Sequence, residues 1–121
     1  MTKTIALIAH DGKKTAMLAF AEAHRAAFQK FRLVATKTTG SLLQTQGFMV
    51  TSVLSGPQGG DAQIAAMVAT GQVHTVIFFR DPLGMHPHEP DIGSLLRICE
   101  VHDVPLATNV ATATLVMKSF V

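Results

Sequence analysis

The stretch TIALIAHDGKK, at residues 4–14, decides the fold class. Its first six residues are apolar or β-branched, which is the pattern of a strand buried on both faces. The polar residues His10, Asp11 and Gly12 end that strand. Apolar residues then recur with helical spacing over residues 13–30, and Asp11 is placed to cap this helix. We therefore expect a strand–turn–helix unit with polar side chains at its turn.

The same alternation of strand and helix continues to the end of the chain. Strands are expected at residues 33–35, 48–54, 73–79 and 105–108, and helices at residues 41–46, 61–70, 91–102 and 111–119. Strands separated by helices pair in parallel through right-handed crossovers, with helices on both faces. The predicted fold is a three-layer, doubly wound α/β domain over residues 1–121. Its five-stranded sheet is mostly parallel, as in flavodoxin-like and Rossmann-like proteins.

Composition narrows the classes of partner and compartment. The 121 residues are 48% hydrophobic and only 15% charged, and the ten Lys and Arg form no basic run. Charged residues make up roughly 25% of an average domain, so we expect part of the surface to be buried in a homo-oligomer. No basic tract suits a nucleic acid and no apolar run suits a membrane. A single cysteine allows no intrachain disulfide, which favours a reducing, cytoplasmic location.

Polar motifs follow the predicted strands, where open α/β sheets bind ligands. These motifs are His10 with Asp11, residues 36–40, residues 55–61, residues 81–91, and Asn109. Because the carboxyl ends of parallel strands share one edge of the sheet, we expect these motifs to lie together.

Residues 55–61, SGPQGGD, are the most informative of these motifs. Residues 55–60 are expected to be irregular, and their three glycines let main-chain N–H groups approach a ligand closely. The helix that follows offers a positive amino end that suits a phosphate. Neither a Walker A loop nor a G-x-G-x-x-G fingerprint is present. Asp61 is a candidate catalytic base, and a simple N-cap is an equally good interpretation of it.

A second candidate phosphate cradle is TKTTG, at residues 36–40. Hydroxyl groups and free amides at a helix start are suitable donors, and an ordinary threonine cap is the alternative. His10 can donate to a substrate oxygen, and Lys14 lies one helical turn further on. The alternative for His10 is a polar residue at a strand end.

The third motif is PHEPD, at residues 87–91. Prolines on both sides stiffen the loop that carries His88, which can act as an acid, a base or a neutral donor. Asp91 is placed to cap the next helix, and Asp81 follows the strand at 73–79. An exposed histidine on a rigid loop is the alternative for His88. The six histidines form no tight ligand pattern with cysteine or carboxylates, so we expect no metal site.

Five segments together resemble the methylglyoxal synthase family. They are AHDGKK at 9–14, ATKTTG at 35–40, LSGPQGGDAQ at 54–63, FFRDPLGMHPHEPD at 78–91 and PLATNVATA at 105–113. The resemblance covers nearly the whole chain, and the motifs come in the same order as in the family. It implies a lyase that converts dihydroxyacetone phosphate into methylglyoxal and inorganic phosphate without a cofactor or metal. It also implies a homohexamer that phosphate inhibits.

The resemblance assigns roles to particular residues. Asp61 matches the catalytic base, and His88 and Asp91 complete the expected catalytic group. The expected substrate-binding residues are His10, Asp11, Lys14, Thr36, Lys37, Thr38, Thr39, Gly40, Ser55, Gly56, Gly60 and Asp81. The sequence departs from the family at Lys37, where a small residue is usual, and at Arg80, where an aromatic residue is common.

Two other functions stay open from the sequence alone. The fold also resembles the regulatory domain of large carbamoyl phosphate synthetases and a domain of a purine-biosynthesis cyclohydrolase, so a non-catalytic binding module is one alternative. A nucleotide-binding flavodoxin-like protein is the other, and the missing dinucleotide fingerprint argues against it.

Overall fold

The structure, a computed structural model, describes residues 2–84 and 92–120. Its sheet contains β1 (Thr4–Ala9), β2 (Arg32–Ala35), β3 (Val50–Ser52), β4 (Thr75–Phe79) and β5 (Leu106–Ala107) in the order β3-β2-β1-β4-β5. Every pair of neighbouring strands is parallel. The predicted parallel α/β sheet is confirmed. The strand order reverses between β1 and β4, and open α/β sheets bind ligands at such a point.

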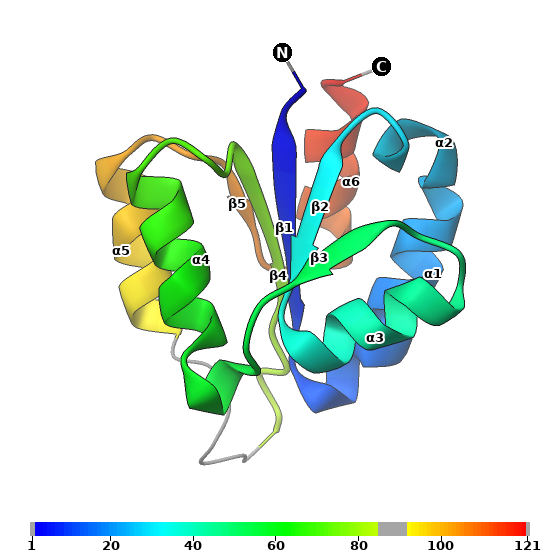
Figure 1. The fold of residues 1–121 in the computed structure, drawn as a ribbon, viewed down its shortest axis with the longest axis horizontal. Helices are drawn as coiled ribbons and strands as arrows, with labels where there is room; N and C mark the ends of the chain where they lie inside the picture. The colour runs from blue at the N-terminus through cyan, green and yellow to red at the C-terminus, as the bar shows by residue number, and fades with distance from the viewer. Residues whose placement is uncertain (1, 85–91, 121) are drawn as a thin grey trace.

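Helices cover both faces of this sheet (Figure 1). One face carries α1 (Lys14–Ala23), α2 (Arg25–Phe28), α3 (Lys37–Thr45) and α6 (Val110–Lys118), and the other carries α4 (Gly60–Ala69) and α5 (Ile92–Val101). Two short 3₁₀ turns, η1 (Asp11–Lys13) and η2 (Gly56–Gln58), follow β1 and β3. Among the described residues, no helix has the length and apolar character needed to cross a membrane.

The buried strand β1 connects the two cores. All six of its residues are buried, and successive side chains of a strand point to opposite faces. Leu7 packs into the core under α1 and α3, whereas Ile8 packs into the core under α4 and α5. This is why the stretch is apolar without alternation.

The helix predicted over residues 13–30 is wrong in one respect, because the chain breaks at His24. His24 has φ −113° and ψ 22°, and its N–H is shared between the carbonyls of Phe20 and Ala21. Its ring packs 4.5 Å from the Phe20 ring and 6.5 Å from the Phe28 ring. A second correction concerns Asp11, which lies in the first turn of η1 while His10 occupies the cap position.

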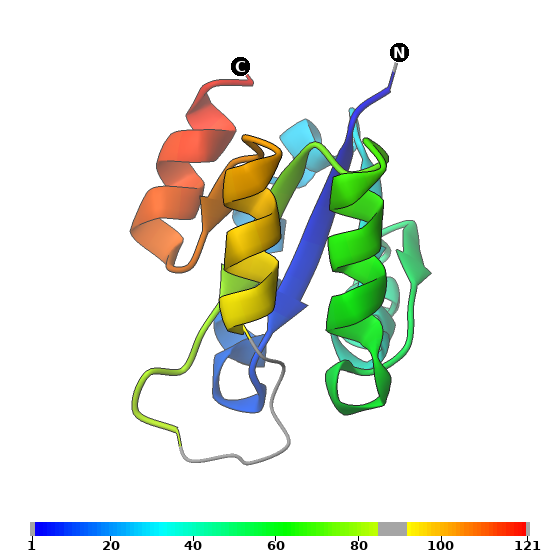
Figure 2. The same ribbon diagram turned by 90° about the vertical axis from the view of Figure 1, so that its left-hand side faces the viewer.

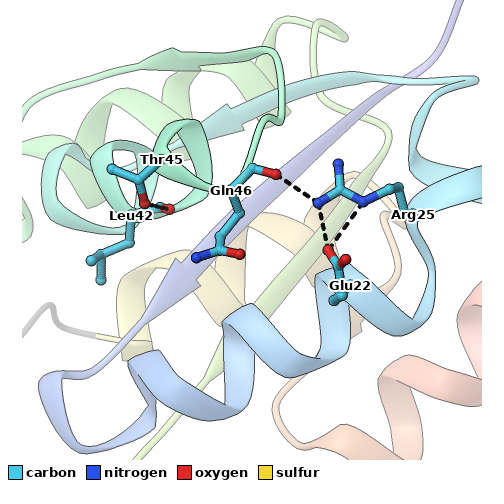
Figure 3. A network of polar contacts seen from close by, with 5 residues as sticks. All are labelled: Glu22, Arg25, Leu42, Thr45 and Gln46. Atoms are coloured by element: carbon cyan, nitrogen blue, oxygen red, sulfur yellow. Dashed lines mark hydrogen bonds and ion pairs between the residues drawn. The ribbon is translucent and has the colours of Figure 1, made fainter.

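Arg25 connects this break to the end of α3 (Figure 3). Its Nε donates to Glu22 Oε2 at 3.0 Å, and its Nη2 donates to the Gln46 carbonyl at 2.6 Å. The guanidinium also lies 4.1 Å from the centre of the Phe48 ring. The last carbonyls of a helix have no partner inside the helix, so this cation satisfies the end of α3.

The remaining differences from the sequence prediction concern element ends. The strands predicted at 48–54 and 105–108 are shorter, because β3 pairs only with β2 and β5 only with β4. The segment 55–60, predicted to be irregular, contains the 3₁₀ turn η2. The last helix begins at Val110, and the side chain of Asn109 caps it by accepting from the Thr112 N–H at 2.9 Å.

Candidate functional site

The carboxyl ends of the strands gather the predicted polar motifs at one edge. The turns that follow β1, β2, β3 and β4 all lie at the lower edge of the molecule in Figures 1 and 2. The structure therefore brings His10, residues 36–40, residues 55–61 and Asp81 to the same edge. His88 and Asp91 lie outside the described residues, so their predicted roles stay predictions.

Lys14 is held inside this edge rather than on a solvated helix face. Its Nζ donates to the Ala9 carbonyl at 2.6 Å and to Thr39 Oγ1 at 3.1 Å. Asp11 Oδ1 lies 3.8 Å from the same Nζ, and the Lys14 side chain is only 15% exposed. The ammonium group thus joins the end of β1 to the start of α3.

The start of α3 differs from its prediction. The helix was expected to begin at Ser41, but it begins at Lys37, with Thr36 as the N-cap. Residues 37–40 therefore form its first turn. Thr36 and Thr39 are buried, whereas Lys37 and Thr38 are exposed. Sequence reasoning missed this start because Thr and Gly have low helix propensity.

The first turn of α3 can hold an anion. Thr36 makes no side-chain capping hydrogen bond within the described structure. The N–H groups of a first helical turn have no partner within the helix and carry the positive end of its dipole. The Lys14 ammonium beside Thr39 adds a full positive charge. Residues 36–39 and Lys14 together therefore suit a phosphate group.

Gly40, expected among the substrate-binding residues, also has a packing role. A Cβ at Gly40 would overlap Ser52 Oγ and lie 3.3 Å from Ser52 Cβ. The absence of a side chain therefore lets α3 pack directly on β3.

The turn at residues 55–61 places Asp61 in the first turn of α4. Gly59 takes the cap position with φ 109°, and α4 begins at Gly60. The interpretation of Asp61 as the N-cap is therefore wrong, and its half-buried carboxylate is not used to cap the helix. A carboxylate in a first turn is stabilised by the helix dipole. The predicted role of Asp61 as a catalytic base stays a prediction.

Gly60 lets α4 begin close to the end of β3. The Gly60 N–H donates to the Ser55 carbonyl at 2.8 Å. A Cβ at Gly60 would overlap the Leu54 carbonyl oxygen and lie 2.8 Å from its carbon. Gln63 Oε1 accepts from the Leu54 N–H at 2.8 Å and holds the same turn. These contacts fix the position of the neighbouring Asp61.

His10 and Asp81 meet where β1 and β4 end. The Asp81 main-chain N–H donates to His10 Nδ1 at 2.9 Å, and Asp81 Oδ1 accepts from the Leu83 N–H at 3.2 Å. His10 is buried, and its ring packs edge-on against Phe78 at 5.2 Å. Sequence reasoning expected both residues at the site and missed this contact, because a main-chain donor leaves no signal in side-chain identity.

The structure describes both residues at which the sequence departs from the family, but only some of the residues that could bind a metal ion. Within residues 2–84 and 92–120, no three His, Cys, Asp or Glu side chains come together in a group that could hold a metal ion. His86 lies outside these ranges, as His88 does. Lys37 and Arg80, the two departures, are both exposed.

Two grooves open at the opposite edge, among the amino ends of the strands. One has a volume of about 970 Å³ and is lined by residues that include Lys3, His74 and Phe120. The other, of about 1190 Å³, also borders His74 and reaches Phe48. Neither groove is lined by a described residue of the predicted site. The described residues of the predicted site lie instead at the carboxyl edge of the sheet.

Comparisons with known proteins point to one family. The family model "MGS-like domain" matches residues 16–108. The methylglyoxal synthase of Carboxydothermus hydrogenoformans is 54% identical over 116 residues, which cover 95% of this chain and 96% of that protein. The methylglyoxal synthase of Ralstonia nicotianae is 56% identical over 116 residues, which cover 95% of this chain and 86% of that protein.

A solved structure gives the same result for the fold. The crystal structure of methylglyoxal synthase from Elizabethkingia anophelis NUHP1 aligns with a TM-score of 0.93 and 42% sequence identity. The alignment covers 96% of this chain and 77% of that chain. With the family model and the relatives, it shows that this chain belongs to the methylglyoxal synthase family.

Proposed function

We propose that this chain, a lyase of the methylglyoxal synthase family, converts dihydroxyacetone phosphate into methylglyoxal and inorganic phosphate. The observation that carries the proposal is the contact of Lys14 Nζ with Thr39 Oγ1, at 3.1 Å. This contact puts a cation beside the uncapped first turn of α3, at the edge that also holds Asp61 and His10. An anion site beside a carboxylate and an imidazole suits proton transfer on a phosphorylated ketone.

The substrate phosphate is bound at two adjacent turns. The first turn of α3, at residues 36–40, supplies main-chain N–H groups and threonine hydroxyls, and Lys14 supplies charge. Ser55 and Gly56 supply further donors ahead of α4, and Gly60 lets this turn approach closely because it has no side chain. Several donors from rigid elements fix the orientation of the phosphate ester as well as its affinity.

Asp61 is the catalytic base. It removes a proton from the carbon that bears the free hydroxyl, and the C–H electron pair moves to form the enediolate. His10 and His88 donate hydrogen bonds to the carbonyl oxygen and stabilise the negative charge that develops there. Asp91 completes the catalytic group, and Asp81, a substrate-binding residue, holds the turn after β4.

Elimination follows when the C–O bond of the phosphate ester stands perpendicular to the enediol plane. The enediolate electrons then expel phosphate, which leaves with the C–O pair, and the resulting enol takes up a proton to give methylglyoxal. Holding this angle is the task of the phosphate site. An isomerase acting on the same substrate keeps the bond in the plane and avoids elimination.

We further infer that the chain forms one domain over residues 1–121 and acts as a homohexamer in the cytoplasm without a cofactor. The single cysteine supports a reducing compartment. The low charged fraction of 15% supports an assembly that buries surface.

The test is to incubate the purified protein with dihydroxyacetone phosphate and to measure methylglyoxal and free phosphate together. We expect equal amounts of both. Asp61→Asn should lower kcat by about 10²- to 10⁴-fold, because the amide cannot accept the proton. Asp103→Asn, an equally conservative change in the turn after α5, should keep full activity. A folded wild-type protein that forms neither product would refute the function, and an active Asp61→Asn variant would refute the base.

A further inference from the structure

Three contacts hold the backbone and the ring of His10 at the point where the strand order reverses. Its main-chain N–H donates to the Phe79 carbonyl at 3.1 Å, which fixes the backbone on β4. The ring packs edge-on against Phe78 with an interplanar angle of 86°. Nδ1 accepts the Asp81 N–H at 2.9 Å. These contacts leave little rotational freedom to the imidazole.

The contact at Nδ1 decides which nitrogen carries the proton. A main-chain N–H can only donate, so Nδ1 must be an unprotonated acceptor. A neutral imidazole with a bare Nδ1 carries its proton on Nε2. Within the same turn, Asp81 Oδ1 accepts from the Leu83 N–H at 3.2 Å.

Gly12 makes room for this turn. A Cβ at Gly12 would overlap Asp81 Oδ2 and lie 3.2 Å from Asp81 Cγ. The turn after β1 and the turn after β4 therefore meet at Gly12, where an added side chain would strike the Asp81 carboxylate. A larger residue at position 12 would displace the Asp81 carboxylate, which holds this turn through the Leu83 N–H, and we expect the Asp81 N–H to shift with it.

We propose that the Asp81 main-chain N–H, admitted by Gly12, is a positioning group that holds His10 as a neutral imidazole donating through Nε2. The inference deepens the proposed function and rests on it, because a neutral Nε2–H is the form that donates to a carbonyl oxygen as it gains charge. Gly12 and Asp81 act through His10 and need not touch the substrate.

The direct test is nitrogen-15 NMR on the uniformly labelled full chain without substrate. We expect His10 Nε2 to be protonated and a scalar coupling through the hydrogen bond between the Asp81 amide nitrogen and His10 Nδ1. The His10 signals are those missing from His10→Asn. A protonated Nδ1, or the absence of this coupling in folded protein, would overturn the inference.

A double-mutant cycle connects the contact to catalysis. Gly12→Ala should abolish the coupling and lower kcat by about 10²-fold, the usual loss of one transition-state donor. Asp81→Ala removes the carboxylate that a Cβ at Gly12 would strike and keeps the N–H. The double variant should therefore regain the coupling and reach the kcat of Asp81→Ala alone. Lys13→Ala, in the same turn as Gly12, should leave the coupling unchanged.

The two proposals fail in different ways. Additive losses in the cycle, with the coupling still missing in the double variant, would contradict the role of Gly12. Protein that shows the coupling but forms no methylglyoxal would contradict the proposed function and leave the orientation of His10 standing.

Discussion

Cys99 shows how burial alone controls the chemistry of one residue. Cys99 is a buried residue of α5, and desolvation raises the pKa of its thiol from 9.0 to about 11. The unfolded chain loses this proton near pH 9 and the folded chain only near pH 11. Between these values the folded state binds more protons, so its stability falls as the pH rises.

The measurement compares wild type with Cys99→Ala by urea unfolding at pH 8 and pH 11. The wild-type free energy of unfolding should fall by on the order of 2 kcal/mol more than that of the variant. A difference that stays constant between the two pH values would contradict the raised pKa. Native protein should also react slowly with thiol reagents at pH 8, since the thiolate is the reactive form.

Lys14 is the residue whose charge bears most on substrate affinity. Lys14→Met keeps most of the apolar stem and removes the ammonium that contacts Thr39 and Ala9. A hydrogen bond to a charged group contributes about 1.5–3 kcal/mol, so KM for dihydroxyacetone phosphate should rise at least tenfold. Inhibition by inorganic phosphate should weaken by a similar factor. Lys13→Met is the matched control, and an equal change in both variants would exclude a specific role for Lys14.

At the scale of elements, the start of α4 depends on a single missing Cβ. Gly60→Ala would press a methyl group against the Leu54 carbonyl, which is main chain and has no rotamer to change. We expect a loss of about 1–3 kcal/mol in stability and a lower kcat, because Asp61 is the next residue. Thermal unfolding and turnover are measured beside Ala62→Ser, an exposed position on the same helix. A Gly60→Ala protein as stable and active as this control would contradict the close approach.

The elements differ in how far sequence predicts them. Apolar runs identified β1 and β4 most clearly, because a strand buried on both faces is apolar without alternation. The break at His24 was missed, since it comes from ring packing against Phe20 and Phe28 rather than from a Gly or Pro. The early start of α3 was missed because its first turn is rich in threonine. Propensity is a weak prior that tertiary contacts override.

At the scale of the whole molecule, sequence predicted that the polar motifs share one edge of the sheet but not the contacts between them. Parallel topology alone brings His10, Asp61 and Asp81 to one edge. The bond from the Asp81 N–H to His10 Nδ1 joins residues 71 positions apart through a main-chain atom. No pattern of residue types encodes that bond, so only coordinates reveal it.

The oligomeric state can be predicted from the surface of the whole chain. Several large apolar side chains are exposed, among them Met49 and Leu83 at 92%, Leu115 at 66% and Val101 at 64%. Exposed apolar side chains mark an interface where they form a patch, so these residues are candidates for one, and the family resemblance implies six subunits. Light scattering at micromolar concentration should therefore give about six times the chain mass of 12.9 kDa. Met49→Glu and Leu115→Glu each place a charge in a different exposed region. If the substituted side chain lies in an interface between subunits, the charge should weaken that interface and lower the mass of the assembly. Wild-type protein that has full activity at the mass of one chain would contradict the hexamer. The exposed apolar side chains would then not lie in an interface between subunits.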